Sequence, residues 1–213
     1  MARRLVSITL DNLDDLPRRC RSCVYWELDP VSGERACANG DAELEKEAWV
    51  SDTLLEWGSC GHLLYVDRVP AGYVLYAPPA YVPRSVAFAT SPPSPDAVLL
   101  MTARLMPEFT GGGLGRSLVQ AVARDVARRG IRAIEAFGRV DKSTDRRSDE
   151  EPDYGCLLPA DYLLAVGFKT VRPHPRTPRL RLDVRTTASW REDVEYALDR
   201  LLAGVQVPAM AGR

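Results

Sequence analysis

The fold is decided by residues 97–129, which read AVLLMTARLMPEFTGGGLGRSLVQAVARDVARR. This stretch begins with an almost continuous apolar run, Ala97–Leu105, which is typical of a central strand covered on both faces. A glycine-rich turn, Gly111–Gly115, follows it. From Leu114 onward apolar residues recur every three to four positions, which predicts an amphipathic helix that Gly130 ends. The sequence therefore predicts a buried strand, a glycine turn and a helix in direct succession.

The glycine turn has the composition of an anion-binding site. Glycines permit backbone conformations that other residues avoid, and they leave main-chain N–H groups uncovered. Such N–H groups, together with the positive end of the following helix, attract phosphates. The dinucleotide-binding pattern fails because its third glycine would fall on Arg116 or Leu118, and the triphosphate-binding pattern fails because Arg116 follows Gly115 where lysine is required. The turn is therefore predicted to bind a diphosphate of another kind.

Further strands and helices are predicted on both sides of this unit from their periodicity and turn residues. Upstream, the sequence predicts a strand over Leu5–Leu10, a short helical piece over Leu13–Leu16, an irregular stretch over Arg18–Gly40, a helix from the cap Asp41 through Trp57, a hairpin of strands His62–Val66 and Gly72–Tyr76, and a proline-rich connection over Ala77–Pro95. Downstream, it predicts a strand over Ile131–Phe137, a long charged loop over Gly138–Leu157, a helix that Pro159 opens and Gly167 closes, strands over Phe168–Val171 and Leu180–Val184, and a last helix with a capping box of Ser189 and Glu192.

The composition argues against two classes of partner. The 28 basic and 29 acidic residues give a formal net charge of −1, without the basic excess of a typical nucleic-acid-binding protein. Apolar runs are all shorter than the roughly 18 residues that cross a membrane. The N-terminal residues also lack the apolar core of a secretion signal, so the sequence predicts a cytoplasmic protein that binds neither nucleic acid nor membrane.

The cysteines leave one alternative open. Five cysteines are an odd number, so reduced thiols are the default and no disulfide framework is predicted. Cys20 and Cys23 have the two-residue gap of a metal knuckle or a redox pair. Cys37, Cys60 and His62 could complete a zinc site, although their spacing matches no familiar pattern. The sequence therefore predicts no metal.

The pattern Thr110-x-x-Gly113-x-Gly115 resembles the pyrophosphate-binding motif of the GNAT superfamily of N-acetyltransferases. That motif is usually Gln or Arg, two residues, Gly, one residue, then Gly or Ala, so Thr110 departs from it. The order of predicted elements over Arg4–Val184 is also similar to the GNAT plan, including the Gly-Phe turn at 167–168 that follows the late helix.

The resemblance implies an α/β (α+β) fold, with a central mixed but mostly antiparallel sheet of about six or seven strands and helices on both faces. Residues 1–185 would form an acyl-CoA-dependent N-acetyltransferase domain, and residues 186–213 would add a C-terminal helix and tail. In this family a central strand splays from its neighbour, and the pantetheine arm of acetyl-CoA lies in the gap. Acetyl-CoA is therefore the expected acyl donor.

The resemblance also implies site residues and a direct attack of an amine on the thioester. Glu135 is the expected base, and Tyr162 is the expected acid for the leaving thiolate, with Tyr154 in reserve. The family's usual tyrosine position is Leu163 here, one residue after Tyr162. The expected coenzyme-binding residues are Ala103, Arg104, Leu105, Thr110, Gly111, Gly112, Gly113, Leu114, Gly115 and Arg116.

The expected acceptor is an amine on a small molecule, a peptide or a protein, and the chain is expected to be a monomer or homodimer. Two alternatives stay open at this point. The first is an acyl-CoA-binding regulatory or interaction module of the same fold, which the unusual Thr110 and the displaced Tyr162 would permit. The second is a nucleotide-binding module.

Overall fold

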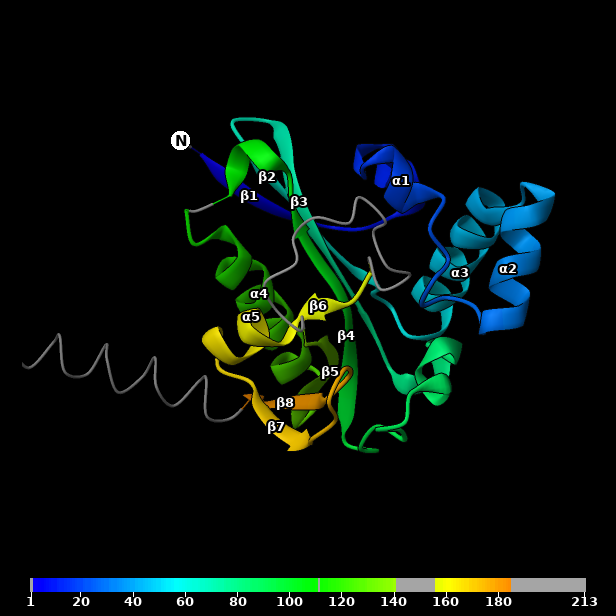
Figure 1. Ribbon diagram of the computed structural model, residues 1–213. Helices are drawn as coiled ribbons and strands as arrows, with labels where there is room; N and C mark the ends of the chain where they lie inside the picture. The colour runs from blue at the N-terminus through cyan, green and yellow to red at the C-terminus, as the bar shows by residue number, and fades with distance from the viewer. Residues whose placement is uncertain (1, 111, 141–155, 185–213) are drawn as a thin grey trace, which may run out of the picture.

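The protein is a single sheet with helices packed on both faces (Figure 1). The structure, a computed structural model, describes residues 2–110, 112–140 and 156–184. The strands are β1 (Arg3–Ser7), β2 (Gly61–Val66), β3 (Val69–Ala77), β4 (Ala97–Leu105), β5 (Ala133–Arg139), β6 (Leu158–Pro159), β7 (Lys169–Arg172) and β8 (Arg179–Asp183). They lie in the order β1-β2-β3-β4-β5-β8-β7, and the two-residue β6 pairs with β5. Among the described strands only the pairs β4–β5 and β5–β6 are parallel, which confirms the predicted mixed, mostly antiparallel sheet.

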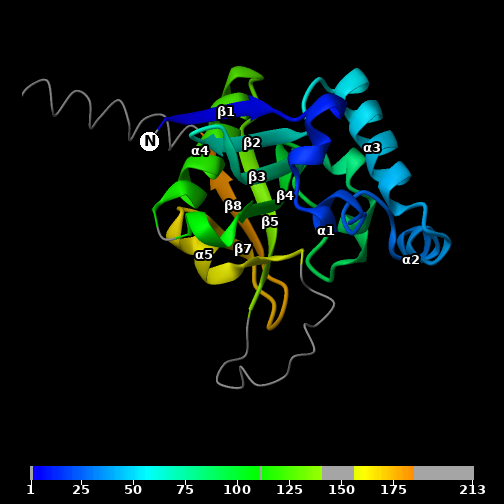
Figure 2. The ribbon, with the colours of Figure 1, turned by 90° about the horizontal axis from the view of Figure 1, so that it is seen from above.

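The α-helices divide between the two faces of the sheet (Figure 2). One face carries α1 (Arg18–Arg21), α2 (Pro30–Asn39) and α3 (Ala42–Glu56), and the other carries α4 (Leu114–Arg128) and α5 (Ala160–Ala165). Short 3-10 turns η1 (Leu10–Asp15), η2 (Pro79–Tyr81), η3 (Pro83–Ala87) and η4 (Pro107–Phe109) lie in the connections. The proline-rich segment between β3 and β4 therefore contains short 3-10 turns but no strand or α-helix, as its composition predicts.

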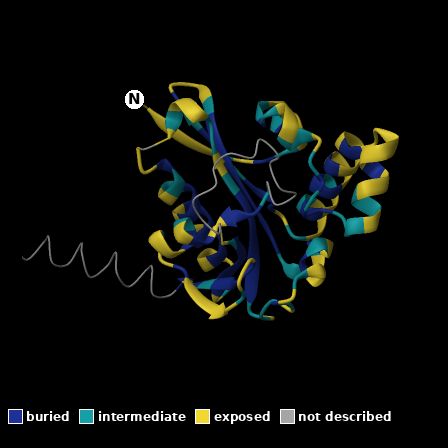
Figure 3. Ribbon diagram, viewed as in Figure 1, coloured by how far each residue is buried: buried dark blue, intermediate teal, exposed yellow. Residues whose placement is uncertain are grey.

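Each face of the sheet buries its own apolar cluster (Figure 3). The stripe of α4 that the periodicity predicts, Leu118, Val122 and Val126, is fully buried against β2, β3 and β4. On the opposite face, β4 packs Leu99 and Met101 against the helical layer of α1–α3. Strand β4 is thus covered on both sides, as its continuous apolar sequence indicates.

The first strand is shorter than predicted. It ends at Ser7, and Leu10 begins a 3-10 turn in which its side chain is about half exposed. The Asn12 side chain explains the ending, because it accepts a hydrogen bond from Thr9 N and donates one to Ser7 O. This local hydrogen bonding competes with continued strand pairing, so the predicted strand through Leu10 is wrong.

The stretch predicted to be irregular contains the helix α2. The carboxylate of Asp29 accepts hydrogen bonds from Val31 N and Ser32 N, and Pro30 occupies the first helical position. Gly40, with φ of 83°, ends the helix in the left-handed conformation. The start and stop signals were therefore present, although the stretch lacks a sustained apolar period.

The hairpin between β2 and β3 is tighter than predicted. Asp67 and Arg68 both have positive φ, and they form a two-residue turn. Strand β3 consequently begins at Val69 rather than at Gly72. Asp41 does precede α3, but its side chain makes no capping hydrogen bond.

Some predictions fall outside the described residues. The last helix and the boundary at residue 185 belong to the undescribed segment 185–213, and most of the charged loop lies in 141–155. Among the described helices, none has both the length and the apolar character that crossing a bilayer requires.

Candidate functional site

The most distinctive feature of the sheet is a fork between its two central parallel strands. β4 and β5 pair only at Ala97↔Ala133, Val98↔Ile134 and Leu99↔Glu135. Beyond this point β4 continues to Leu105, still paired with β3, and β5 continues to Arg139, where it pairs with β6. The short β6 takes the place of β4 beside β5 at this end of the strand. One edge of β4 is thereby left without a partner strand from the described part of the sheet.

In a strand, successive residues direct their main-chain N–H and C=O groups to opposite sides, and this alternation identifies the groups on the open edge of β4. Met106 N donates a hydrogen bond to Ala71 O, at the β3 side. The carbonyl of Arg104 also faces β3, because a Cβ placed on Gly72 would lie 2.6 Å from that oxygen. Main-chain groups point to opposite sides at successive residues, so those of Ala103 and Leu105 face the fork. Of the expected donor-binding strand residues, Arg104 turns its main chain away.

The start of α4 lies at the end of the connection that leaves β4, and its helix N-terminus has no side-chain cap. Gly113 has φ of 73°, a conformation that suits glycine, and the helix begins at Leu114. The first turn contains no acidic residue. A Cβ placed on Gly112 or Gly113 would meet nothing within 4 Å, so the approach to these residues is open. The first N–H groups of a helix that lack a cap bind anions well.

Tyr162 of α5 packs directly against this first turn. A Cβ on Gly115 would lie 3.0 Å from the Tyr162 hydroxyl oxygen, which gives a packing reason for glycine at that position. The hydroxyl is buried, and it has no hydrogen-bond partner among the described residues. Burial raises the pKa of Tyr162 to about 12, so the phenol stays protonated at neutral pH. An unpartnered buried donor beside an open helix start fits a bound polar ligand.

Two other residues of the motif are already engaged. The Thr110 hydroxyl donates to Pro107 O at 2.9 Å, within the turn that precedes the glycines. Arg116 donates to Ala165 O at 2.8 Å, where it satisfies a carbonyl at the end of α5. Gly111 lies outside the described residues. The Thr110 and Arg116 side chains are thus engaged within the protein, so the main-chain N–H groups at the start of α4 are the candidate ligand-binding groups.

The arrangement was compared with known proteins. No protein-family model and no curated protein matches the sequence. Solved structures do match the fold. The chain superposes on the PaiA N-acetyltransferase of Thermoplasma acidophilum in complex with coenzyme A with a TM-score of 0.54 and 12% identity, covering 86% of this chain and 99% of that one. An N-acetyltransferase of Staphylococcus aureus Mu50 gives a TM-score of 0.53, 10% identity and coverages of 86% and 99%.

A third solved structure matches the fold over a similar share of the chain. The loading GNATL domain of CurA from Lyngbya majuscula superposes with a TM-score of 0.51 and 12% identity, covering 87% of this chain and all of that domain. The chain has the GNAT fold. At these identities the comparison establishes the shared architecture, and it leaves the activity to be argued from the site.

Glu135, the expected base, lies at the closed end of the fork. Its side chain is fully buried. It accepts hydrogen bonds from Ser94 N at 3.0 Å and Ser94 Oγ at 2.6 Å, and it forms an ion pair with Arg179 at 2.5 Å. Its register partner Leu99 is the last residue of β4 that pairs with β5. These contacts favour a structural role for Glu135, and its assignment as the base stays a prediction that they do not support.

A bulge in β4 supplies the second part of the site, and sequence reasoning missed it. Leu75 pairs with Thr102 whereas Tyr76 pairs with Leu100, so Met101 is an extra residue. The bulge puts Thr102 and Arg104 on the same face as Met101, toward the helical layer of α1–α3. No signal in the sequence marks this position, because the apolar run continues through it.

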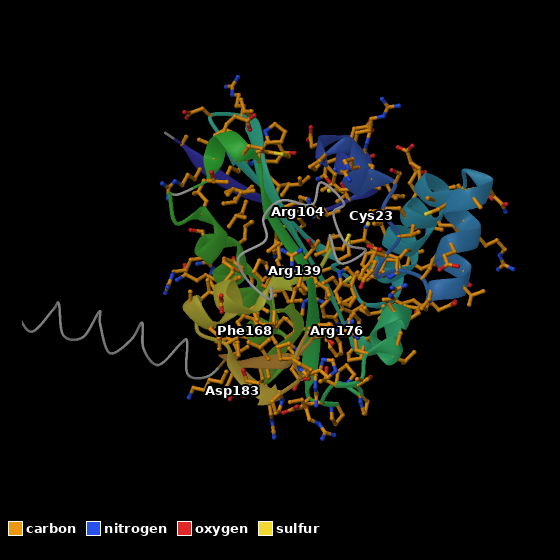
Figure 4. All side chains as sticks on the ribbon, in the orientation of Figure 1. Cys23, Arg104, Arg139, Phe168, Arg176 and Asp183 are labelled. Atoms are coloured by element: carbon orange, nitrogen blue, oxygen red, sulfur yellow. The ribbon has the colours of Figure 1, made fainter. Side chains whose placement is uncertain are left out.

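The bulge opens onto a cavity of about 140 Å³ between β4 and the helical layer. Figure 4 labels Cys23 and Arg104, which line it from the helical layer and from β4. Its floor contains a buried ion pair between Lys46 and Glu27, both about 3% exposed. Such a pair could not be found from the sequence, since its members are separated by a helix and a loop.

The five cysteines do not all lie together in the structure. Cys20 and Cys23 line the cavity together with Cys156, whereas Cys37 is exposed and Cys60 is buried elsewhere in the core. Within the described ranges, no three His, Cys, Asp or Glu side chains are placed to hold a metal ion. The described residues thus do not form the alternative zinc site.

Proposed function

We propose that the protein is an acyltransferase that moves an acetyl or other acyl group from acyl-CoA to a primary amine. One observation carries the proposal: the open edge of β4 runs toward an uncapped helix start with two uncovered glycines. An extended ligand with an amide-containing arm and a diphosphate matches both parts. The fold neighbours named as N-acetyltransferases support the same reaction class.

The fork would hold the acyl donor in two ways. Main-chain groups of Ala103 and Leu105 would hydrogen-bond its arm as an added strand would. The first N–H groups of α4, with Gly112 and Gly113 leaving the approach open, would bind the diphosphate. Bound acyl-CoA supplies an activated thioester. Main-chain donors aimed at the developing oxyanion would then stabilise the transition state.

The acceptor amine would reach the fork from the opposite face, through the cavity beside Thr102 and Arg104. We propose direct attack on the thioester, with Tyr162 as the proton donor to the leaving thiolate. The role fits Tyr162 because its hydroxyl is protonated at neutral pH and has no partner among the described residues. The amine would lose its proton to water in this route, since Glu135 is occupied by Arg179 and Ser94.

The proposal is tested with the full-length protein, acetyl-CoA and a panel of small amines, amino acids and peptides. Acetyl-CoA and coenzyme A are separated by chromatography, because a thiol reagent would also react with the protein's five cysteines. Amine-dependent release of coenzyme A supports the proposal. Tight coenzyme A binding without turnover on any amine would instead favour the regulatory module, and stronger thermal protection by ATP would favour a nucleotide-binding protein.

Tyr162→Phe is expected to lower kcat roughly a hundredfold, the lower range for loss of a general acid. Coenzyme A affinity should change less than about threefold, because the ring and its packing remain. Steady-state kinetics and calorimetric titration separate the two effects. Tyr81→Phe is the matched control, since Tyr81 donates its hydroxyl to Glu56 in the η2 region. A Tyr162→Phe variant that loses affinity but keeps kcat would assign the hydroxyl to donor binding instead.

A further inference from the structure

Three thiols meet in the cavity between β4 and the helical layer. Cys20 lies in α1 and Cys23 shortly after it, while Cys156 lies two residues before β6. All three are partly buried. The cavity, about 140 Å³, has room for a few water-sized molecules at roughly 30 Å³ each. Because all three cysteines are also partly exposed, a small reagent can reach the thiols without unfolding of the protein.

Within this group Cys23 and Cys156 are in contact. Their sulfur atoms lie 3.0 Å apart, although 133 positions separate the residues in sequence. Lys46 donates to Cys23 O at 3.0 Å and pairs with Glu27, so the main chain at Cys23 is held in place. The contact thus joins the helical layer to the segment that enters β6.

The surroundings make the two thiols chemically different. The hydrogen bond from Cys156 lowers the pKa of Cys23 to about 6, against burial and the charge of Glu27, and Lys46 also lowers it. The same hydrogen bond raises the pKa of Cys156, as do its burial and Glu27, whereas Arg104 opposes this rise. Cys23 is therefore the thiol of the pair that ionises more readily, and Cys156 is the one that tends to keep its proton. An accessible thiolate beside a second thiol is the arrangement found in redox-sensing cysteine pairs.

We propose that Cys23 and Cys156 form a peroxide-sensitive dithiol, in which Cys23 is oxidised first and Cys156 closes a reversible disulfide across the cavity. The site goes beyond the proposed acyl transfer and does not depend on it. The two-residue spacing of Cys20 and Cys23 suggests a different redox pair, but the structure places Cys23 against Cys156 instead.

The chemistry balances with hydrogen peroxide as the oxidant. The Cys23 thiolate attacks one peroxide oxygen, the O–O bond breaks, and the leaving hydroxide takes the Cys156 proton to give water and a Cys23 sulfenic acid. The Cys156 thiolate then attacks the Cys23 sulfur, forming the S–S bond and releasing hydroxide, which takes a proton from solvent. Two thiols lose two electrons in total, and one peroxide becomes two waters.

Disulfide formation would alter the acceptor side of the fork. Thr102 and Arg104 line the same cavity as the two thiols. A bond between Cys23 and Cys156 would fix the helical layer to the chain entering β6 and would fill part of the cavity. If the proposed acyl transfer is correct, oxidation should raise KM for the acceptor while leaving coenzyme A affinity unchanged.

The experiment treats the reduced full-length protein with hydrogen peroxide, blocks remaining thiols with iodoacetamide and maps the peptides by mass spectrometry. A Cys23–Cys156 crosslink that dithiothreitol reverses is the expected product. Cys60 is an internal control: its burial raises the pKa to about 12, so its thiol should react at least tenfold more slowly than Cys23. Cys37→Ser should leave the crosslink unchanged. Cys156→Ser should abolish it and leave a Cys23 sulfenic acid that dimedone captures.

A Cys20–Cys23 crosslink, irreversible oxidation of Cys23 with Cys156 still free, or an unreacted Cys23 would each overturn the proposal. These results come from the unmodified sequence, so they do not depend on whether a variant folds. Failure of acyl transfer would leave the crosslink result unaffected. Calorimetric titration of coenzyme A before and after oxidation separates the two questions.

Discussion

Replacing Gly112 with aspartate is expected to weaken coenzyme A binding at least tenfold while the protein stays folded. A Cβ at this position would meet nothing within 4 Å, so the substitution should not disturb the packing. It does place a carboxylate beside the uncapped start of α4, where the diphosphate would bind. Two like charges about 6 Å apart near a surface repel by roughly 1–3 kcal/mol. Tenfold in affinity corresponds to about 1.4 kcal/mol, and calorimetric titration measures it.

Two variants at the same residue separate charge from backbone effects. Gly112→Ala adds a methyl group without charge and should change the affinity less than about threefold, because the space is open. Gly112→Lys should bind as well as the unaltered protein or more tightly. Equal losses in all three variants would assign the effect to glycine's backbone freedom. Unchanged binding in Gly112→Asp would place the phosphates somewhere other than the start of α4.

The strand, glycine turn and helix over residues 97–129 could be predicted because each is specified locally. A continuous apolar run must be covered on both faces, and β4 is. An apolar residue every three to four positions must face the sheet along one stripe, and α4 does so through Leu118, Val122 and Val126. The glycine turn lies in the same short segment, so its position at the start of the helix was predicted as well, whereas the missing side-chain cap is a finding of the structure.

Other features depend on contacts between distant segments, and the sequence could not indicate them. The bulge at Met101 is a property of how β4 pairs with β3, and it reverses the faces on which Thr102 and Arg104 would otherwise lie. The contact of Cys23 with Cys156 likewise requires the helical layer and the entry to β6 to meet. By contrast, α2 was missed despite Asp29, Pro30 and Gly40, because apolar periodicity was given more weight than helix caps.

Glu135 shows how a family resemblance and a structure can assign one residue differently. The resemblance assigns a carboxylate on this strand to proton transfer. The structure instead places Glu135 between Ile134 and Ala136 in a fully buried strand, where an ionised group needs a partner. The closest partner is Arg179 of β8, which lies opposite Phe137 and 44 positions away in sequence, and the register partner Arg181 adds a second ion pair at 3.4 Å. A glutamate inside an otherwise apolar strand is a signal to look for a cation or hydrogen-bond donors elsewhere in the chain.

Glu135→Ala is accordingly expected to lower the free energy of unfolding by about 3–5 kcal/mol, the usual cost of removing one member of a buried ion pair. The substitution leaves Arg179, which is 6% exposed, without its carboxylate, and it also removes the acceptor for Ser94 N and Ser94 Oγ. Urea unfolding followed by circular dichroism measures the change. Asp14→Asn is the matched control: Asp14 pairs with Arg21, outside the Glu135 network, with 90% of its side chain exposed. Its loss should cost no more than about 1 kcal/mol.

The variant Glu135→Gln distinguishes the structural role from catalysis. Glutamine keeps the shape of the side chain and one acceptor oxygen, so a measurable fraction of the protein should remain folded. A residue that only holds the closed end of the fork should leave kcat per folded molecule within about threefold of the unaltered value. A base that accepts the amine proton should lose roughly a hundredfold or more in kcat on the same substitution, with stability little changed. The latter result would return Glu135 to the catalytic site and require the fork to open at Leu99, where the strands now pair.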